Sequence, residues 1–236
     1  MKHRLFLLDL DDTLLDFKAS ERVAFARVMR SLGLDQPLDA VFGDYQAINH
    51  DLWRRFEQGA VAKEFLKVER FRATFARHGF DLDAAAASER YLDTLAETTV
   101  LIDGALELCA QLAAVGEVGV ITNGVERIQS RRVQGSGLAP YIAFVATSEA
   151  CGHAKPDSRF FDYSVAQASV FDRPSTVIIG DRLDADILGA HQFGIDSCWF
   201  NPQGLANESP VRPSCEVSRL QDVVPALKRL AASAAP

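Results

Sequence analysis

The sequence has few cysteines, no excess of basic residues and no long apolar run, and each shortage disfavours a class of protein. Four cysteines occur among 236 residues, with no CxxC pair, so neither a disulfide framework nor a zinc site is indicated. Lysine and arginine total 25 against 32 acidic residues, and the net charge is -7. General binding to a nucleic-acid backbone needs a basic field, so we expect no nucleic-acid polymer as a partner.

No stretch approaches the ~20 apolar residues that a membrane-spanning helix needs, so we expect no membrane association. The apolar run Leu5–Leu8 is too short for a signal peptide, and Asp9 interrupts it. The scattered cysteines predict reduced thiols, and therefore a cytoplasmic protein. We expect this protein to be a monomer or a homodimer.

The sequence does contain 48% hydrophobic residues, enough for one sizeable core and a smaller second unit. Short apolar runs, typical of strands buried on both faces, occur at Leu5–Leu10, Val118–Ile121, Ile142–Ala146, Thr176–Ile179 and Ser197–Phe200. Helical stretches lie among the later runs, at Gly104–Val115, Val125–Ser136, Ser158–Ser169 and Asp184–Phe193. This alternation predicts a doubly wound, Rossmann-like α/β core with a mostly parallel sheet.

The stretch from 17 to 99 contains no good candidate for a buried strand. We expect it to form helices, over Glu21–Leu32, Asp39–Phe56, Lys63–His78 and Ala84–Glu97. The predicted organisation is therefore a core domain, 1–16 and 100–236, with a helical cap domain, 17–99, inserted after the first strand. An insert in that loop hangs over the edge of the sheet where ligands bind, so it is a candidate lid.

Four short segments carry residues suited to phosphate chemistry at the ends of predicted strands. They are Asp9-Leu10-Asp11-Asp12-Thr13, Ile121-Thr122-Asn123-Gly124, Ala154-Lys155-Pro156, and Gly180-Asp181 with Asp184 and Asp186. Ligands of doubly wound sheets bind beyond the carboxyl ends of the strands. We therefore expect these distant segments to meet at one site.

Asp9 and Asp11 are the most informative pair, because residues i and i+2 of a strand share one face. Two carboxylates in one cleft stay charged only if something offsets them, and a divalent cation does so. Mg²⁺ prefers oxygen ligands and binds substrate phosphate, and Asp181 can add a third carboxylate. One carboxylate can attack phosphorus, while a second protonates the leaving oxygen and then activates water.

The other two segments supply groups that bind a phosphate. Thr122 can donate its hydroxyl to a phosphoryl oxygen, and the helix start near Asn123 and Gly124 offers backbone amides to an anion. Lys155 supplies positive charge for the transition state, and Pro156 restricts the backbone that carries this lysine.

Simpler interpretations exist for each segment taken alone. Asp9, Asp12 and Thr122 can be ordinary turn residues, and an isolated lysine such as Lys155 is usually a solvated surface residue. Asp184 is better interpreted as a helix N-cap than as a site residue. Only the combination of all four segments favours a catalytic site.

With these segments in this order, the chain resembles the haloacid dehalogenase superfamily of aspartate-nucleophile phosphatases. The resemblance implies that Asp9 is the nucleophile and Asp11 the acid/base, and that Thr122 and Lys155 hold the phosphate. It also implies that Mg²⁺ is bound by Asp9, Asp181 and the backbone carbonyl of Asp11. Dehalogenase members of the superfamily lack the second aspartate of the first motif, so Asp11 favours the phosphatase activity.

The same resemblance implies that Asp186 orients metal-bound waters or Lys155. A finer resemblance lies in two further segments, Asp44-Tyr45-Gln46-Ala47-Ile48-Asn49 with Leu52-Trp53, and Cys198-Trp199-Phe200-Asn201. They are similar to the bacterial pyrimidine 5′-nucleotidase branch, whose members hydrolyse nucleoside monophosphates.

Three residues are candidates for gripping a base, since aromatic rings stack on bases: Phe17, Asn49 and Trp53. An alternative is that Trp53 and Phe56 form the core of the cap itself.

We therefore expect a Mg²⁺-dependent phosphomonoester hydrolase that acts on a small phosphorylated metabolite, most of all a nucleoside 5′-monophosphate. A sugar-phosphate or phosphoglycolate phosphatase and a phosphomutase on the same scaffold are alternatives. A non-catalytic binding or regulatory protein is the alternative from another class.

Overall fold

The computed structural model describes residues 1–34 and 38–233. The chain divides into two compact units, one formed by Met1–Phe17 and Thr99–Pro236 and the other by Lys18–Thr98. The last three residues of the first unit lie outside the described part. The two are called here the core unit and the helical unit. Within the described residues, no helix combines the length and the apolar character needed to cross a membrane.

The core unit contains a six-stranded sheet with the order β3-β2-β1-β4-β5-β6, in which every neighbouring pair is parallel. The strands are β1 (Leu5–Leu8), β2 (Glu117–Thr122), β3 (Phe144–Thr147), β4 (Thr176–Gly180), β5 (Asp196–Phe200) and β6 (Cys215–Val217). The expected doubly wound α/β fold is confirmed, and β6 is an addition that the sequence did not indicate.

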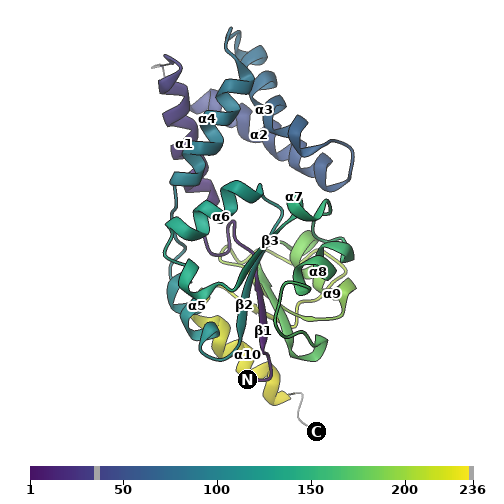
Figure 1. The fold of residues 1–236 in the computed structure, drawn as a ribbon. Coiled ribbons are helices and arrows are strands. Elements are labelled where there is room, and N and C mark those ends of the chain that lie inside the picture. Colours follow the sequence, from purple (N-terminus) through teal and green to yellow (C-terminus); the bar gives the residue numbers. More distant parts are fainter. Residues whose placement is uncertain (35–37, 234–236) are drawn as a thin grey trace. The chain divides into compact units, whose positions relative to one another are not determined.

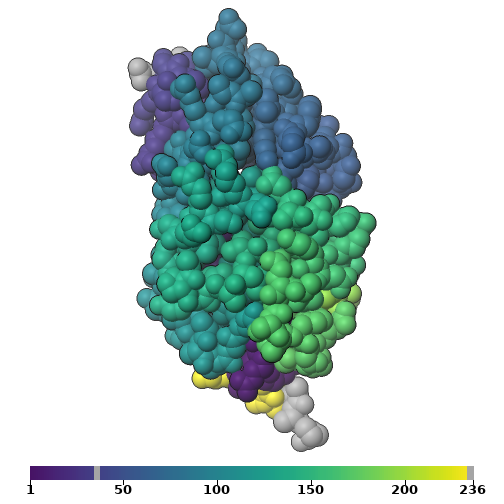
Figure 2. Space-filling model, viewed as in Figure 1, coloured from purple at the N-terminus to yellow at the C-terminus, as the bar shows by residue number. Residues whose placement is uncertain are grey.

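Hydrophobic packing on both faces of the sheet explains why its strands are continuous apolar runs. Phe6 and Leu8 of β1 pack with one cluster, which includes side chains of α5 and α10, whereas Leu5 and Leu7 pack with side chains of α8 and α9. The two groups of helices flank the sheet in Figure 1. All four residues of β1 are buried, and in the space-filling view of Figure 2 the visible face of the core unit is formed mainly by later segments, coloured teal and green.

The α-helices of the core unit are α5 (Ala105–Ala113), α6 (Glu126–Gly135), α7 (Ser148–Cys151), α8 (Ser158–Val165), α9 (Leu188–Phe193) and α10 (Val223–Ser233). Short 3-10 turns lie at Ala139–Tyr141, Arg173–Ser175 and Leu220–Asp222. A π-helical turn, Leu183–Ile187, precedes α9, so the helix predicted over Asp184–Phe193 begins with a widened turn. The C-terminal helix α10 was not predicted.

The helical unit contains α2 (Asp39–Glu57), α3 (Lys63–His78), α4 (Ala84–Glu97) and all of α1 (Phe17–Ser31) except its first residue. All four helices occur where the sequence predicted them, and α3 and α4 have the predicted bounds. Buried aromatic rings form its centre, with ring centroids 4.7–5.9 Å apart in the contacts that join Phe25, Tyr45, Phe71, Phe75 and Tyr91.

A buried polar network also lies in the helical unit. Glu21 accepts hydrogen bonds from Gln46 Nε2 and Asn49 Nδ2, each at 3.1 Å. Arg70 donates to Asn49 Oδ1 at 3.3 Å, and its guanidinium lies 4.6 Å from the Tyr91 ring centroid. The network therefore joins one acid and one base through a neutral amide.

Candidate active site

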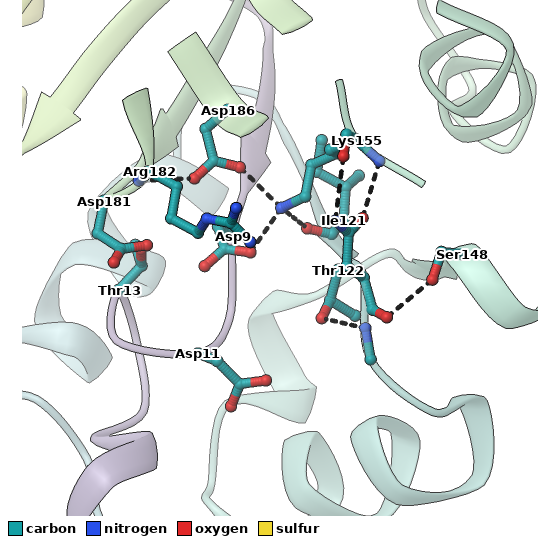
Figure 3. Close-up of polar contacts among 12 residues, drawn as sticks. Asp9, Asp11, Thr13, Ile121, Thr122, Ser148, Lys155, Asp181, Arg182 and Asp186 are labelled. Atoms are coloured by element: carbon teal, nitrogen blue, oxygen red, sulfur yellow. Dashed lines mark hydrogen bonds and ion pairs between the residues drawn. The ribbon is translucent and has the colours of Figure 1, made fainter. Parts of the chain in front are cut away.

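The four segments that carry phosphate chemistry meet at the carboxyl edge of the sheet, as Figure 3 shows. Asp9 directly follows β1, Thr122 is the last residue of β2, and Asp181 directly follows β4. Lys155 comes from the loop between α7 and α8, and its peptide bond to Pro156 is cis. Because all these strands are parallel, their carboxyl ends lie on one side, and residues far apart in sequence converge there.

Lys155 is the centre of the site, and it is almost fully buried. Its Nζ lies 2.5 Å from Asp9 Oδ1 and 2.7 Å from Asp186 Oδ1, and it donates to the carbonyl of Ile121 at 2.8 Å. Burial alone would lower the pKa of the lysine, but the carboxylates of Asp186 and Asp9 raise it above its ordinary value. These contacts therefore favour the charged ammonium form of Lys155.

Carboxylates outnumber the ammonium at this point of the site. Oxygen atoms of Asp9, Asp181 and Asp186 all lie within 4.8 Å of one another, and these three residues are called here the acidic cluster. Burial, partly offset by Lys155 and reinforced by Asp186, raises the pKa of Asp9 to about 7. Burial and the nearby charges of Asp9 and Asp186 raise the pKa of Asp181 to about 8. The ionised cluster is thus costly without a further positive charge.

Glycine at position 180 explains how Asp186 reaches the acidic cluster. Asp186 is buried and accepts a hydrogen bond from the backbone N–H of Arg182 at 3.1 Å. A Cβ at Gly180 would lie 2.3 Å from Asp186 Oδ2 and 2.4 Å from its Cγ, far inside van der Waals contact. Gly180 therefore leaves the space in which the Asp186 carboxylate folds back against the end of β4.

The acidic cluster fits a divalent cation in its donor chemistry and its charge. All of its ligand atoms are carboxylate oxygens, which Mg²⁺ prefers. Within the group formed by Lys155 and the acidic cluster, one ammonium faces three carboxylates, an excess of two negative charges that a divalent ion would balance. Trp199 Nε1 donates to the backbone carbonyl of Asp181 at 2.8 Å and holds this loop in place.

Thr122 is buried, and its hydroxyl is held as a hydrogen-bond donor. Its Oγ1 accepts from the backbone N–H of Gly124 at 3.1 Å and from Gln129 Nε2 at 3.0 Å. Both lone pairs of the hydroxyl are then in use, so its hydrogen is what it can offer to an anion. This geometry suits the phosphate contact that the sequence predicted for Thr122.

The side chain of Asn123 holds the backbone of the lysine. Its Nδ2 donates to the Lys155 carbonyl at 3.1 Å, and the Lys155 N–H donates to its Oδ1 at 2.8 Å. Ser148 Oγ donates to the Asn123 carbonyl at 2.8 Å. These bonds join the loops after β2 and β3, and they set where Lys155 emerges.

Asp11 differs from the expectation drawn from strand alternation. Because β1 ends at Leu8, Asp9 and Asp11 do not share a strand face, so strand alternation is not what places the Asp11 carboxylate. Asp11 Oδ2 accepts from Gln129 Nε2 at 2.6 Å, and its Oδ1 pairs with Arg132 Nη1. Its side chain lies apart from the group around Asp9 and Lys155 in Figure 3, and its carboxylate is not in the acidic cluster.

Two neighbouring aspartates have other roles in the structure. Asp12 adopts a positive φ of 61°, and its Oδ1 accepts from the backbone N–H of Phe17, the first residue of α1, at 3.1 Å. Asp184 is mostly exposed and pairs with Arg182 at 2.7 Å. The expectation that Asp184 is an N-cap is wrong, because Arg182 occupies the cap position of that turn.

The three candidates for contact with a base have different surroundings. The ring centroid of Phe17 lies 5.8 Å from the Arg132 guanidinium in the core unit. Asn49 is buried in the polar network of the helical unit. Trp53 is half-buried, its ring centroid is 5.7 Å from that of Phe56, and the Lys63 ammonium lies over both rings.

Gln129 and Arg132 were missed by the sequence reasoning, although both are buried and contact Asp11. They lie three residues apart on α6, so they share a helix face. Polar residues at that spacing, in the helix that directly follows the Thr122 segment, were the available signal.

The chain is similar to known proteins over most of its length. Residues 3–194 match the model of the haloacid dehalogenase-like hydrolase family. The pyrimidine 5′-nucleotidase PynA of Streptococcus pneumoniae is 34% identical over 230 residues, which are 97% of each chain. The pyrimidine 5′-nucleotidase YjjG of Escherichia coli is 30% identical over 226 residues, which are 94% of this chain and 97% of YjjG.

A solved structure resembles the whole chain as well. The HAD-hydrolase YfnB of Bacillus subtilis, crystallised with bound magnesium, superimposes with a TM-score of 0.88 at 33% identity. The match covers 96% of this chain and 99% of that one.

Proposed function

Because the chain belongs to the haloacid dehalogenase-like hydrolase family and is a phosphatase, we propose that it hydrolyses nucleoside 5′-monophosphates, pyrimidine nucleotides above all. The observation that carries the proposal is Lys155, held between Asp9 and Asp186 at the edge where the Thr122 hydroxyl also lies. A dianionic phosphate needs both a positive charge and donors, and these residues provide them.

Asp9 is the proposed nucleophile. Its Oδ1 is bound to Lys155, which leaves Oδ2 to attack phosphorus. A bond forms between Oδ2 and phosphorus as the ester bond to the leaving oxygen breaks, and that oxygen takes a proton from Asp11. Asp11 then accepts a proton from the water that attacks the aspartyl-phosphate, and phosphate is released with Asp9 restored.

Lys155 and Thr122 hold the phosphoryl oxygens through both steps, and Asp186 keeps the lysine in place. Asp9, Asp181 and the backbone carbonyl of Asp11 would bind Mg²⁺, with Asp186 beside them, and the ion would supply charge neutralisation of the phosphoryl oxygens. The chain itself supplies the acidic cluster, and contacts with Gly180, Trp199 and Lys155 hold the cluster in place before any ion binds.

The helical unit is the proposed cap domain, which excludes bulk water during the attack. The pyrimidine preference is supported by the similarity of nearly the whole chain to the pyrimidine 5′-nucleotidases PynA and YjjG. Phe17 and Trp53 are the proposed contacts with the base, since an aromatic ring can stack on it. Asn49 would join them only by exchanging its present bonds to Glu21 and Arg70.

The proposal is tested by phosphate release from UMP, dUMP and dTMP against hexose phosphates and phosphoglycolate, with Mg²⁺ and with EDTA. We expect Mg²⁺-dependent turnover with the highest kcat/KM on the pyrimidine nucleotides. Uniform weak activity on every substrate would contradict the nucleotide preference but leave the phosphatase activity standing. Isomerised hexose phosphate in place of free phosphate would identify a phosphomutase.

The nucleophile is tested separately with Asp9→Asn, which keeps the shape of the side chain. We expect turnover to fall by orders of magnitude while the far-UV circular dichroism stays that of the native protein. Full activity in this variant, with deamidation excluded by mass spectrometry, would overturn the assignment. Asp172→Asn, at an exposed position of the core unit, is the matched control and should leave turnover unchanged.

A further inference from the structure

Arg132 is a buried arginine with a single carboxylate partner among the described residues. It is 0% exposed, and its Nη1 contacts Asp11 Oδ1 and Gln129 Oε1, the latter at 3.1 Å. Its Nε and Nη2 are buried without a hydrogen-bond partner in the described part of the chain. Burying a guanidinium is costly, so Asp11, its one carboxylate partner in the described part of the chain, is held firmly against it.

Gln129 is oriented by this arginine. Since Arg132 donates to Oε1, the amide group must present Nε2 on its other side. The two hydrogens of Nε2 serve two acceptors, Asp11 Oδ2 at 2.6 Å and Thr122 Oγ1 at 3.0 Å. One buried amide thus connects the proposed acid/base with the hydroxyl proposed to bind the phosphate.

The backbone beside Thr122 leaves room for this amide. A Cβ at Gly124 would lie 2.3 Å from Gln129 Nε2 and 2.6 Å from both its Cδ and its Cγ. Three atoms of the side chain would have to shift, so glycine at this position permits the observed place of Gln129. The absence of a side chain at Gly124 is therefore a second observation, independent of the hydrogen bonds, that the backbone leaves space for Gln129 in this position.

Both oxygens of the Asp11 carboxylate are therefore held by side chains of α6, and the carboxylate is directed by that helix rather than by β1. A general acid contributes only if it lies within hydrogen-bond reach of the leaving oxygen, and small misplacements are costly. The position of the leaving oxygen is set in turn by the phosphate, which Thr122 helps to hold.

We propose that Gln129 and Arg132 are positioning residues, which hold the Asp11 carboxylate in fixed relation to the Thr122 hydroxyl and so determine where it meets the leaving oxygen. The inference rests on the proposed function, because it takes Asp11 as the acid/base. It adds two side chains of α6 that act through Asp11 and Thr122 rather than on the substrate.

The test uses the dependence of a general acid on its leaving group. An alkyl phosphate such as UMP needs protonation of its leaving oxygen, whereas p-nitrophenyl phosphate releases a stable anion without it. Single-turnover cleavage with excess enzyme reports the first step alone. For Arg132→Met and Gln129→Met, we expect cleavage of UMP to slow by roughly 10–100-fold and that of p-nitrophenyl phosphate by less than about threefold. KM for UMP should change little.

Matched controls lie on the same helix. Arg131 and Gln134 are exposed, so Arg131→Met and Gln134→Met should leave both rates unchanged. Arg132→Lys, which keeps a positive charge, should recover part of the UMP rate. If Arg132→Met fails to fold by circular dichroism, Gln129→Met and Arg132→Lys carry the test, since both keep the buried charge.

Several outcomes overturn the inference. Equal losses on both substrates would show a merely structural role, and unchanged rates in the folded variants would show none. Asp11→Asn separates the inference from the function on which it rests. If Asp11→Asn slows UMP selectively while the α6 variants do not, positioning by α6 is wrong. If Asp11→Asn itself shows no selectivity between leaving groups, the proposed acid role is wrong, and the inference is overturned with it.

Discussion

The core unit and the helical unit each contain a buried cluster of charged side chains, but the network around Asn49 in the helical unit is balanced in charge whereas the acidic cluster of the core unit is not. Around Asn49, the carboxylate of Glu21 and the guanidinium of Arg70 share one neutral amide. In the core unit, by contrast, Asp9 and Asp186 share the ammonium of Lys155, and Asp181 adds a further carboxylate.

The difference teaches how to interpret buried charge. A balanced network can be satisfied by the folded chain alone, so it supports structure. In the unbalanced cluster, burial together with repulsion between the acids raises the pKa of Asp9 and Asp181, and this cost remains until a ligand offsets the charge. Charge imbalance combined with burial is therefore the feature that marks the candidate active site.

Removing the ammonium at the centre of the core site should have the largest effect. Lys155→Met leaves Asp9 and Asp186 without their shared partner and the phosphate without its point charge. We expect phosphate release to fall by about 10²–10³-fold or more and the free energy of unfolding to fall by about 3–5 kcal/mol. Steady-state kinetics and urea unfolding measure the two effects. Near-native turnover in Lys155→Met would contradict the view that the unbalanced cluster of the core unit is the one that serves catalysis.

The balanced network should respond in stability rather than in chemistry. Arg70→Met leaves Glu21 without its charged counterpart, so the free energy of unfolding should fall by about 3 kcal/mol. Turnover per folded molecule should change far less than in Lys155→Met. Arg72, an exposed residue of the same helix, provides the control Arg72→Met. A large loss of kcat in Arg70→Met without loss of stability would show that this network takes part in catalysis.

Metal binding should offset the imbalance in the core unit. Mg²⁺ at 100 times its Kd should stabilise the protein by about 2.7 kcal/mol, which raises Tm by roughly 5–10 °C for a chain of this size. Asp181→Asn should remove that shift and, in EDTA, raise Tm above that of the unmodified protein, because it removes a repelling charge. Differential scanning calorimetry with and without Mg²⁺ measures both. A Tm for Asp181→Asn below the native value in EDTA would contradict the charge imbalance.

The smallest effect is expected at Asp184, two residues before Asp186. Asp184 is exposed and forms a surface pair with Arg182, so Asp184→Asn should change the free energy of unfolding by less than about 1 kcal/mol and leave turnover unchanged. Asp186→Asn, which alters a buried partner of Lys155, should lower turnover strongly. Similar losses of turnover in Asp184→Asn and Asp186→Asn would show that the exposed and the buried aspartate of this turn matter equally for activity.

Much of the fold was predictable, because strands buried on both faces leave a strong pattern. β1, β2, β4 and β5 occur at the predicted apolar runs, and α3 and α4 have the predicted bounds. β6 escaped notice because only three residues form it, at one edge of the sheet. α10 follows it and packs Val223, Ala226 and Leu227 into the core, a helical spacing that the sequence reasoning did not use.

The site was predictable in its residue types but not in its contacts. Asp9, Lys155 and Asp181 were expected together, and the structure brings them together. The direction of Asp11 was not, because it depends on where β1 ends and on which side chains α6 presents. No rule of spacing connects Asp11 with Gln129 and Arg132, which lie 118 and 121 residues away.

By itself, the amino-acid sequence determined the alternation of buried strands and helices, and it placed acids, a hydroxyl and a lysine after the strands, since local periodicity and chain order decide both. Only the tertiary structure decided that Asp186 shares the lysine with Asp9 while Asp11 turns to α6. The physical reason is that charge pairing inside a protein depends on distances through space, and those distances exist only once the loops of a parallel sheet are packed at one edge.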